Sequence, residues 1–166
     1  MKIFLLDTKI HIRNKFSCEE ESLTEYIQTQ ASQDMKKNLA ACFVLIDGNE
    51  NSIKGYYTLA SNSINKDEIP IEYKSKVPKN YNVPVTLLGR LARDITMKGK
   101  SAGEFLLIDA LERSYRISKN AIGSMAVVVD PINENAISFY KKYGFIILPD
   151  SGKMFLSMKT ISKLFE

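Results

Sequence analysis

Apolar and polar positions follow two different periods along the chain, and the changes between them predict the order of its elements. Short apolar runs bounded by turn residues are typical of strands, whereas apolar positions three and four residues apart are typical of helices. Strands are expected at residues 3–6, 40–46, 53–60, 83–92, 125–129, 145–148 and 154–158. Helices are expected over residues 23–31, 102–118 and 133–143, with a short helix at the C-terminus. The order β-α-β-β-β-α-β-α-β-β predicts an α/β protein with a mixed sheet and helices on both faces.

The helix expected over residues 102–118 has the clearest amphipathic pattern. Its buried stripe is expected to hold Gly103, Leu106, Leu107, Ala110, Leu111 and Ser114, and its water-facing side Glu104, Asp109, Glu112, Arg113 and Arg116. Residues 17–20 and 22–25 each match a capping box, which marks the start of a helix. The polar residues 62–82 contain two prolines and are expected to form a long loop that holds one helical turn.

Length, charge and cysteine content narrow the class of protein only modestly. A chain of 166 residues suits one domain over residues 1–166. A formal charge of +4 fits an anionic partner and equally a merely soluble surface. Cys18 and Cys42 lack metal-ligand spacing and are expected to be reduced, buried thiols of a cytoplasmic protein. No cluster of metal ligands is present in the sequence, and the apolar start is too short for a membrane span.

A glycine-bearing loop, residues 98–103, lies between an expected strand and the long helix. Small residues at Ser101, Ala102 and Gly103, with positive charge at Lys98 and Lys100, suit a backbone cradle for a pyrophosphate at a helix N-terminus. The alternative is a plain strand–helix turn in which the glycine at the helix start permits close helix–sheet packing. The loop fits neither a Walker A motif nor a dinucleotide fingerprint.

Together with residues 88–94 before it and residues 133–145 after it, this loop resembles the GNAT family of acetyl-CoA-dependent N-acetyltransferases. The positions of the family pattern Gln/Arg-x-x-Gly-x-Gly/Ala are occupied here by Lys98, Ser101 and Gly103, and Lys98 departs from Gln/Arg but keeps a hydrogen-bond donor. Ser101 departs from glycine, which could constrain the turn and weaken cofactor affinity. The resemblance implies a central, mostly antiparallel sheet with helices on both faces and acetyl-CoA as the acetyl donor. It implies as cofactor-binding residues Leu91, Ala92, Arg93, Lys98, Gly99, Lys100, Ser101, Ala102, Gly103 and Asn133.

Segments over nearly the whole chain are similar to one branch of this family, the toxins of bacterial toxin–antitoxin modules. These segments are residues 16–18, 31–34, 55–60, 77–85 and 88–92. The resemblance implies acetylation of the α-amine of aminoacyl-tRNA, which blocks translation. It also implies a DNA-binding antitoxin of the ribbon-helix-helix type and a homodimer.

Amine acetylation needs a general acid that protonates the departing thiolate, and the resemblance favours Tyr140 for this role. An unperturbed phenol has a pKa of about 10 and is protonated at neutral pH. The alternative is a core tyrosine on the apolar helix face. Asn133 can cap that helix or hydrogen-bond the cofactor arm. No side chain stands out as a general base: His11 is expected at the surface or in packing, Asp94 and Glu134 as exposed carboxylates, and ordered water can serve.

Recognition of tRNA requires basic residues beside the acetyl site. The candidates are Lys79, Arg90, Lys141 and Lys142, with further basic residues at Lys74, Lys76, Arg93, Lys98 and Lys100. Some of them must serve the cofactor phosphates, and for the others the alternative is an ordinary solvated surface. Arg90 and Arg93 are three residues apart and share no strand face unless Gly89 introduces a bulge. Two other functions stay open: acetylation of a small-molecule or protein amine, and a non-catalytic module that binds acetyl-CoA or RNA.

Overall fold

The computed structural model describes residues 1–166, which form two compact units. The first unit comprises residues 1–60 and 89–110, and the second comprises residues 61–88 and 111–166. Three elements run through both units: β3 (Ile53–Asn65), β4 (Asn82–Arg93) and α4 (Ala102–Asn120). None of the helices combines the length and the apolar character that a membrane span needs.

The first unit contains an antiparallel arrangement of strands. The hydrogen-bonded order is β1 (Lys2–Leu5), β2 (Ala41–Ile46), β3 and β4. In the register of the sheet, Leu5 pairs with Phe43, and Phe43 pairs with Tyr57. The amide of Asp94, just after β4, donates to the Lys54 carbonyl at the start of β3, 2.9 Å away. The strands expected at residues 3–6, 40–46 and 53–60 are therefore confirmed.

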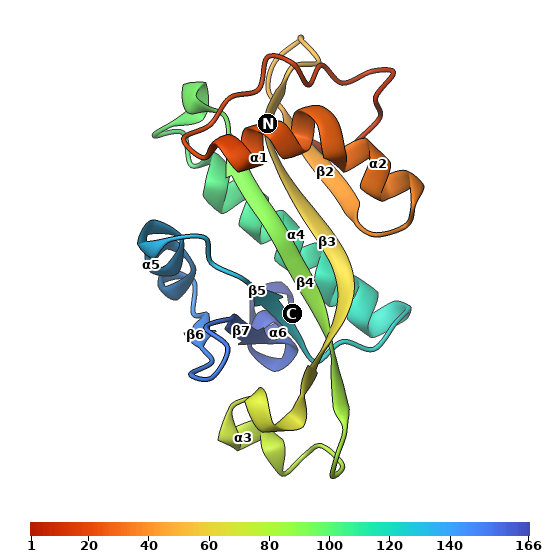
Figure 1. Cartoon of the computed structure of the whole chain (residues 1–166), viewed down its shortest axis with the longest axis vertical. Helices are drawn as coiled ribbons and strands as arrows, with labels where there is room; N and C mark the ends of the chain where they lie inside the picture. Colours follow the sequence, from red (N-terminus) through yellow and green to blue (C-terminus); the bar gives the residue numbers. More distant parts are fainter. The chain divides into compact units, whose positions relative to one another are not determined.

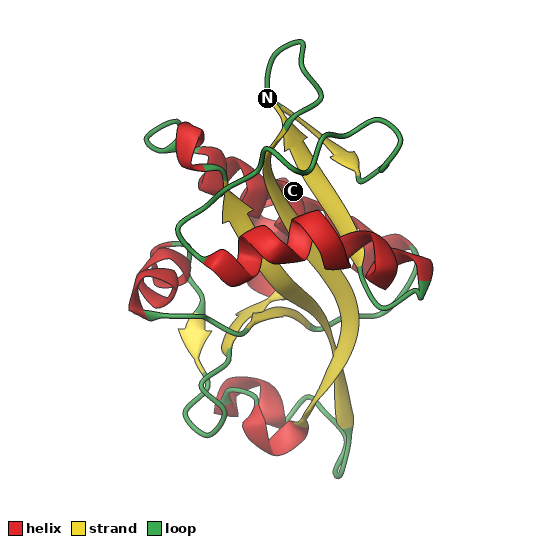
Figure 2. Ribbon diagram, turned by 45° about the horizontal axis from the view of Figure 1, so that its top comes forward, coloured by secondary structure: helices red, strands yellow, loops and turns green.

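Helices cover both faces of the sheet in the first unit (Figures 1 and 2). Across one face run α1 (Glu21–Glu25), the π-helical segment η1 (Tyr26–Gln30) and α2 (Ala31–Lys36). Their buried side chains, which include Tyr26 and Ile27, pack with Val44 and Tyr56 of the sheet. The start of α4 lies on the other face, because a Cβ added at Gly55 would come within 2.8 Å of Leu106 Cδ1.

Two expectations about these helices are wrong. The residue before α1 is Glu20, and its side chain makes no capping hydrogen bond, so neither expected capping box forms at this helix start. Asp109 does not simply face water on α4, because it is half-buried and accepts a 2.5 Å hydrogen bond from the Tyr57 hydroxyl. The apolar stripe of α4 is confirmed by the full burial of Leu106 and Leu107.

The second unit contains the strand order β3, β4, β5 (Ala126–Val129), β7 (Met154–Ser157) and β6 (Ile146–Ile147). Strands β4 and β5 are parallel, with Thr86 opposite Val127, whereas β5, β7 and β6 pair antiparallel. Every residue of β5 is buried, as expected of a strand that is covered on both faces. The helices of this unit are α5 (Glu134–Lys142), α6 (Met158–Phe165), the rest of α4 and the short α3 (Ile71–Lys74).

Residues 62–82 contain more structure than the expected loop. Strand β3 continues to Asn65, and η2 (Lys66–Glu68) and α3 (Ile71–Lys74) follow before β4 begins at Asn82. The Tyr73 hydroxyl of α3 donates to Ser157 Oγ of β7 at 2.9 Å, which fixes this short helix within the second unit. Polar side chains on an edge segment hide such a strand extension from a hydrophobic pattern.

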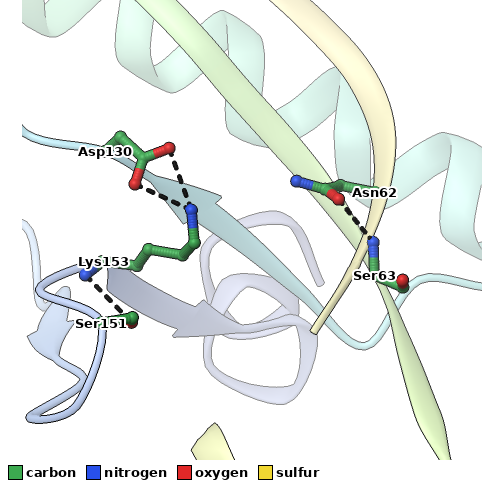
Figure 3. A network of polar contacts seen from close by, with 5 residues as sticks. All are labelled: Asn62, Ser63, Asp130, Ser151 and Lys153. Carbon is green, nitrogen blue, oxygen red and sulfur yellow. Dashed lines mark hydrogen bonds and ion pairs between the residues drawn. The ribbon is translucent and has the colours of Figure 1, made fainter. Parts of the chain in front are cut away.

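An ion pair joins two segments of the second unit (Figure 3). Lys153 Nζ donates to both carboxylate oxygens of Asp130, at 3.0 and 3.1 Å. Asp130 directly follows β5 and precedes the segment that leads to α5, whereas Lys153 precedes β7. The pair therefore ties the exit of β5 to the β6–β7 hairpin.

Candidate functional site

The site begins with an open edge of β4 in the first unit. The ladder between β4 and β5 ends where Leu88 pairs with Val129, the last residue of β5. Residues 89–93 therefore lie beside β3 on one side and have no strand partner on the other. Leu91, Ala92 and Arg93, which were predicted to bind the cofactor, lie in this segment. An extended ligand can pair with such backbone groups as an added strand does.

The predicted cofactor loop follows directly. After the 3₁₀ turn η3 (Ile95–Met97), residues 98–101 are exposed and α4 begins at Ala102. Gly99 and Ser101 have left-handed backbones, with φ of +79° and +58°. The first N–H groups of a helix have no partner within it and carry its positive dipole end. Two lysines, Lys98 and Lys100, lie beside these groups, so the loop has the features of an anion site.

Tyr140 lies on α5 in the second unit and is 8% exposed. Its ring meets Phe139 and Phe145 edge-on, with both centroid distances at 5.2 Å. Burial raises the pKa of this phenol above its usual value, so the hydroxyl stays protonated at neutral pH. The hydroxyl makes no hydrogen bond within the protein and is not enclosed. The ring packs as a core tyrosine does, but its hydroxyl is available to a ligand.

Asn133 and Gly144 delimit the helix that carries this tyrosine. Asn133 Oδ1 accepts the Ala136 N–H at 2.9 Å and caps α5, as predicted. Gly144 follows the helix with a left-handed φ of +94°, a conformation that commonly ends a helix. Tyr140 is thus held on a helix with a defined beginning and end. The role of Asn133 toward the cofactor arm stays a prediction.

Two arginines near the open edge of β4 have unused hydrogen-bond donors. The Arg90 guanidinium carbon lies 3.7 Å from the ring centroid of Tyr26, and the guanidinium makes no hydrogen bond within the protein. Arg93 Nη2 lies 4.0 Å from Glu19 Oε1, and Arg93 Nη1 is buried without an acceptor. Stacking fixes the orientation of a guanidinium while leaving its five N–H groups free for an anion.

The partner of Arg90 was not predictable from the sequence. Tyr26 stacks with Tyr56 at 6.1 Å, and its hydroxyl donates to Asp34 Oδ2 at 2.9 Å. Burial, followed by the hydrogen bond to Asp34, raises the pKa of Tyr26. Because Tyr26 and Arg90 lie far apart in sequence, no spacing rule could pair them.

The remaining predicted tRNA contacts lie in the second unit. Lys79 is exposed between α3 and β4, and Lys141 and Lys142 are exposed on α5 next to Tyr140. Lys142 Nζ lies 5.6 Å from the ring centroid of Tyr143. Exposure keeps all three ammonium groups available, and their role toward tRNA stays a prediction.

Among the groups considered as a base, Asp94 differs most from expectation. An exposed carboxylate was expected, but Asp94 is buried, with 4% of its surface exposed. It accepts three hydrogen bonds from Ser17 and Thr96. Burial opposes ionisation, but the hydrogen bonds from Thr96 and Ser17 prevail and hold its pKa below the usual value. His11 is buried and accepts the Asp7 N–H at Nδ1, which confirms a packing role. Glu134 is exposed, as expected.

The cysteines and possible metal ligands add no further chemistry. Cys42 is buried, Cys18 is half-buried, and both are free thiols. Burial raises the pKa of Cys42 to about 12, so this thiol is protonated at neutral pH. No group of three or more histidine, cysteine, aspartate or glutamate side chains could hold a metal ion.

The strand order, the open edge of β4 and the loop before α4 define a protein of the GNAT acyltransferase fold. No protein-family model matches the chain. However, the chain is 33% identical over 145 residues to a tRNA-acetylating toxin of Mycobacterium tuberculosis (strain ATCC 25618 / H37Rv), a match covering 87% of this chain and 84% of that protein. The chain therefore belongs to the family of tRNA-acetylating toxins.

Solved structures of toxins share the fold over nearly the whole chain. A tyrosine-to-phenylalanine mutant of KacT has a TM-score of 0.91 at 27% identity, covering 99% of this chain and 98% of that one. AtaT complexed with acetyl-methionyl-tRNAfMet has a TM-score of 0.90 at 28% identity, covering 99% of both chains. AtaTR bound with acetyl-CoA has a TM-score of 0.86 at 30% identity, covering 99% of this chain and 98% of that one.

Proposed function

We propose that the protein transfers an acetyl group from acetyl-CoA to the α-amine of aminoacyl-tRNA and so blocks translation in the cytoplasm. One observation carries this proposal: in a member of the tRNA-acetylating toxin family, an unpaired strand edge leads directly into an exposed, lysine-bearing loop at a helix N-terminus. We propose that residues 1–166 act as one catalytic domain.

The acetyl donor is bound mainly by backbone groups. Residues 91–93 pair with the acetyl-pantetheine arm as an added strand, and an N–H of this edge stabilises the oxyanion. Residues 98–103 hold the pyrophosphate with backbone N–H groups and the lysine charges. Asn133 contributes a polar contact to the cofactor arm.

The reaction is a nucleophilic acyl substitution. The free α-amine attacks the thioester carbonyl and forms a tetrahedral intermediate, whose collapse breaks the carbon–sulfur bond and releases CoA. Tyr140 gives its proton to the departing thiolate, and ordered water accepts the proton that the amine loses. The buried ring and the unpaired hydroxyl of Tyr140 suit this role, because both keep the proton available to a ligand.

Basic residues supply the contacts to the acceptor RNA. Arg90, Lys79, Lys141 and Lys142 contact phosphates near the 3′ end of the tRNA. The unused donors of Arg90 suit a phosphate because a planar guanidinium can bind two of its oxygens at once. A ribbon-helix-helix antitoxin neutralises the toxin, and the toxin itself forms a homodimer.

The decisive experiment is transfer of labelled acetyl from acetyl-CoA to bulk aminoacylated tRNA, with deacylated tRNA as the control. We expect label only in the charged pool, and we expect Tyr140→Phe to lower kcat at least about 100-fold, in line with the loss of general-acid catalysis. Tyr143→Phe, a nearby substitution of the same kind, is expected to retain activity.

The other outcomes separate the alternatives. Label on polyamines or peptides, but not on charged tRNA, would identify a small-amine or protein acetyltransferase. Binding of acetyl-CoA without label in any pool would indicate a non-catalytic module. Either result would refute acetylation of aminoacyl-tRNA by this protein.

A further inference from the structure

Asp94 lies where the open edge of β4 passes into the loop before α4, and the proposed chemistry does not use it. Its carboxylate is 4% exposed. Three hydrogen bonds hold it in place. A buried carboxylate is costly unless its hydrogen bonds are well made, and here the Lys54 charge acts with those hydrogen bonds to lower the pKa of Asp94. Its position beside a cofactor loop therefore calls for a functional explanation.

The two carboxylate oxygens bind two different segments of the first unit. Oδ1 accepts the Ser17 N–H at 2.9 Å, and the Ile95 N–H donates to the Ser17 carbonyl, also at 2.9 Å. Ser17 is thus fixed by both of its backbone groups to the end of β4. Oδ2 accepts the Thr96 N–H at 2.9 Å and the Thr96 hydroxyl at 2.6 Å, so it caps η3.

The exposed loop continues from this capped turn. The Met97 carbonyl at the end of η3 accepts the Lys100 N–H at 3.1 Å. Met97 itself is buried at 2% exposure, which anchors the turn in the core. The direction in which the N–H groups of residues 98–101 point therefore depends on a turn whose cap is Asp94. A loop held in its binding geometry avoids the entropy cost of ordering when the ligand arrives.

We infer that Asp94 is a positioning residue for the acetyl donor: it holds the cofactor loop and the end of β4 in the geometry that binds acetyl-CoA. This inference rests on the proposed function of that loop. Charge and geometry predict opposite results, which makes the inference testable. A negative charge near a pyrophosphate weakens binding, so removal of the charge alone would lower the Kd for acetyl-CoA. Loss of the loop geometry, in contrast, would raise the Kd for acetyl-CoA.

The test compares three variants by titration calorimetry with acetyl-CoA and by steady-state kinetics. In Asp94→Asn, an amide NH₂ group replaces one of the two carboxylate oxygens and faces the N–H or O–H group that this oxygen accepted from. We expect it to raise both the Kd and the KM for acetyl-CoA roughly 10-fold, because the loop must be ordered on binding. We expect kcat at saturating acetyl-CoA to change less than about 3-fold, since no group that touches the reacting atoms is altered.

Two further variants separate positioning from general damage. Thr96→Val removes only the hydroxyl hydrogen bond, so we expect a smaller rise in Kd, about 2- to 3-fold. Asp7→Asn changes a carboxylate that accepts the Lys9 N–H elsewhere in the first unit, and we expect its Kd to match the wild type. If Asp94→Asn fails to fold, Thr96→Val still tests the inference, because it keeps the carboxylate.

An unchanged or lower Kd in Asp94→Asn and in Thr96→Val would overturn the inference. A large fall in kcat with an unchanged KM would also overturn it, because the residue would then act on the chemical step. Failure of the wild type to bind acetyl-CoA would instead refute the proposed function of the loop. The calorimetric arm needs no acceptor, so the two failures can be told apart.

Discussion

At the residue scale, Ser101 has a backbone conformation that glycine adopts without steric cost. Its φ is +58°, and Gly99 in the same loop has a φ of +79°. The family pattern has glycine at the position of Ser101, so this chain carries strain in the loop that is proposed to hold the pyrophosphate. A left-handed residue with a Cβ costs roughly 1–2 kcal/mol.

We therefore expect Ser101→Gly to stabilise the protein. The relieved strain exceeds the extra entropy that glycine gives the unfolded chain, and the free energy of unfolding should rise by up to about 1 kcal/mol. Gly99→Ala introduces the same strain two residues earlier and should lower the free energy of unfolding by about 1–2 kcal/mol. Urea denaturation measures both. A Ser101→Gly variant less stable than the wild type would contradict this account of the loop.

At the scale of elements, the stacking of Arg90 on Tyr26 joins β4 to the π-helical segment η1. Single π-helical turns are often found at functional sites. The segment begins at Tyr26, whose ring lies under the guanidinium and whose hydroxyl is bound to Asp34. The stack fixes the direction of the guanidinium donors, because the planar group lies flat on the ring.

Arg90→Lys should raise the KM for aminoacyl-tRNA about 5- to 10-fold, because lysine keeps the charge but loses the stack and the planar donors. Tyr26→Phe keeps the ring and should have a much smaller effect. Arg116→Lys on the exposed side of α4, where Arg116 pairs with Glu112, serves as the matched control. Equal KM values for Arg90→Lys and Arg116→Lys would argue against a role for Arg90 in tRNA binding.

Elements whose apolar residues recur regularly along the sequence were predictable, whereas elements without such a regular apolar pattern were not. Strand β5 and helix α4 follow apolar patterns that burial enforces, so their positions agree with the prediction. The extension of β3 to Asn65 was missed because its last residues are mostly polar. A helix was expected over the residues of η1, but its π-helical form was not, because a single π-helical turn and an α-helical turn show nearly the same spacing of apolar residues.

The same distinction applies to the site. The loop and the helix of Tyr140 are contiguous motifs, which a sequence displays directly. The bond from Ser17 to Asp94 and the contact of Tyr26 with Arg90 join residues more than sixty positions apart. Such pairs depend on the strand register and on the path of the chain before α1, which no local pattern encodes.

At the scale of the whole molecule, the response to mild acid depends on the single histidine. Burial lowers the pKa of His11 below its usual 6.5, with Asp7 opposing, and Nδ1 accepts the Asp7 N–H only while it is unprotonated. The unfolded chain therefore binds a proton at a higher pH than the folded protein does. By linkage, this contribution to stability is complete above the unfolded pKa and is lost as the pH falls through 6.5 toward the folded value.

We expect the free energy of unfolding, measured with urea, to be lower at pH 5.5 than at pH 7.5. His11→Asn places an amide oxygen near the position of Nδ1, stays neutral across this range, and should flatten the dependence. The hydrogen-bonded carboxylates of Asp34 and Asp94 also have lowered pKa values, but they lose their contribution only below about 3.8, outside this window. An equally steep decline in His11→Asn would show that other groups control the acid response, because the only histidine would then be absent.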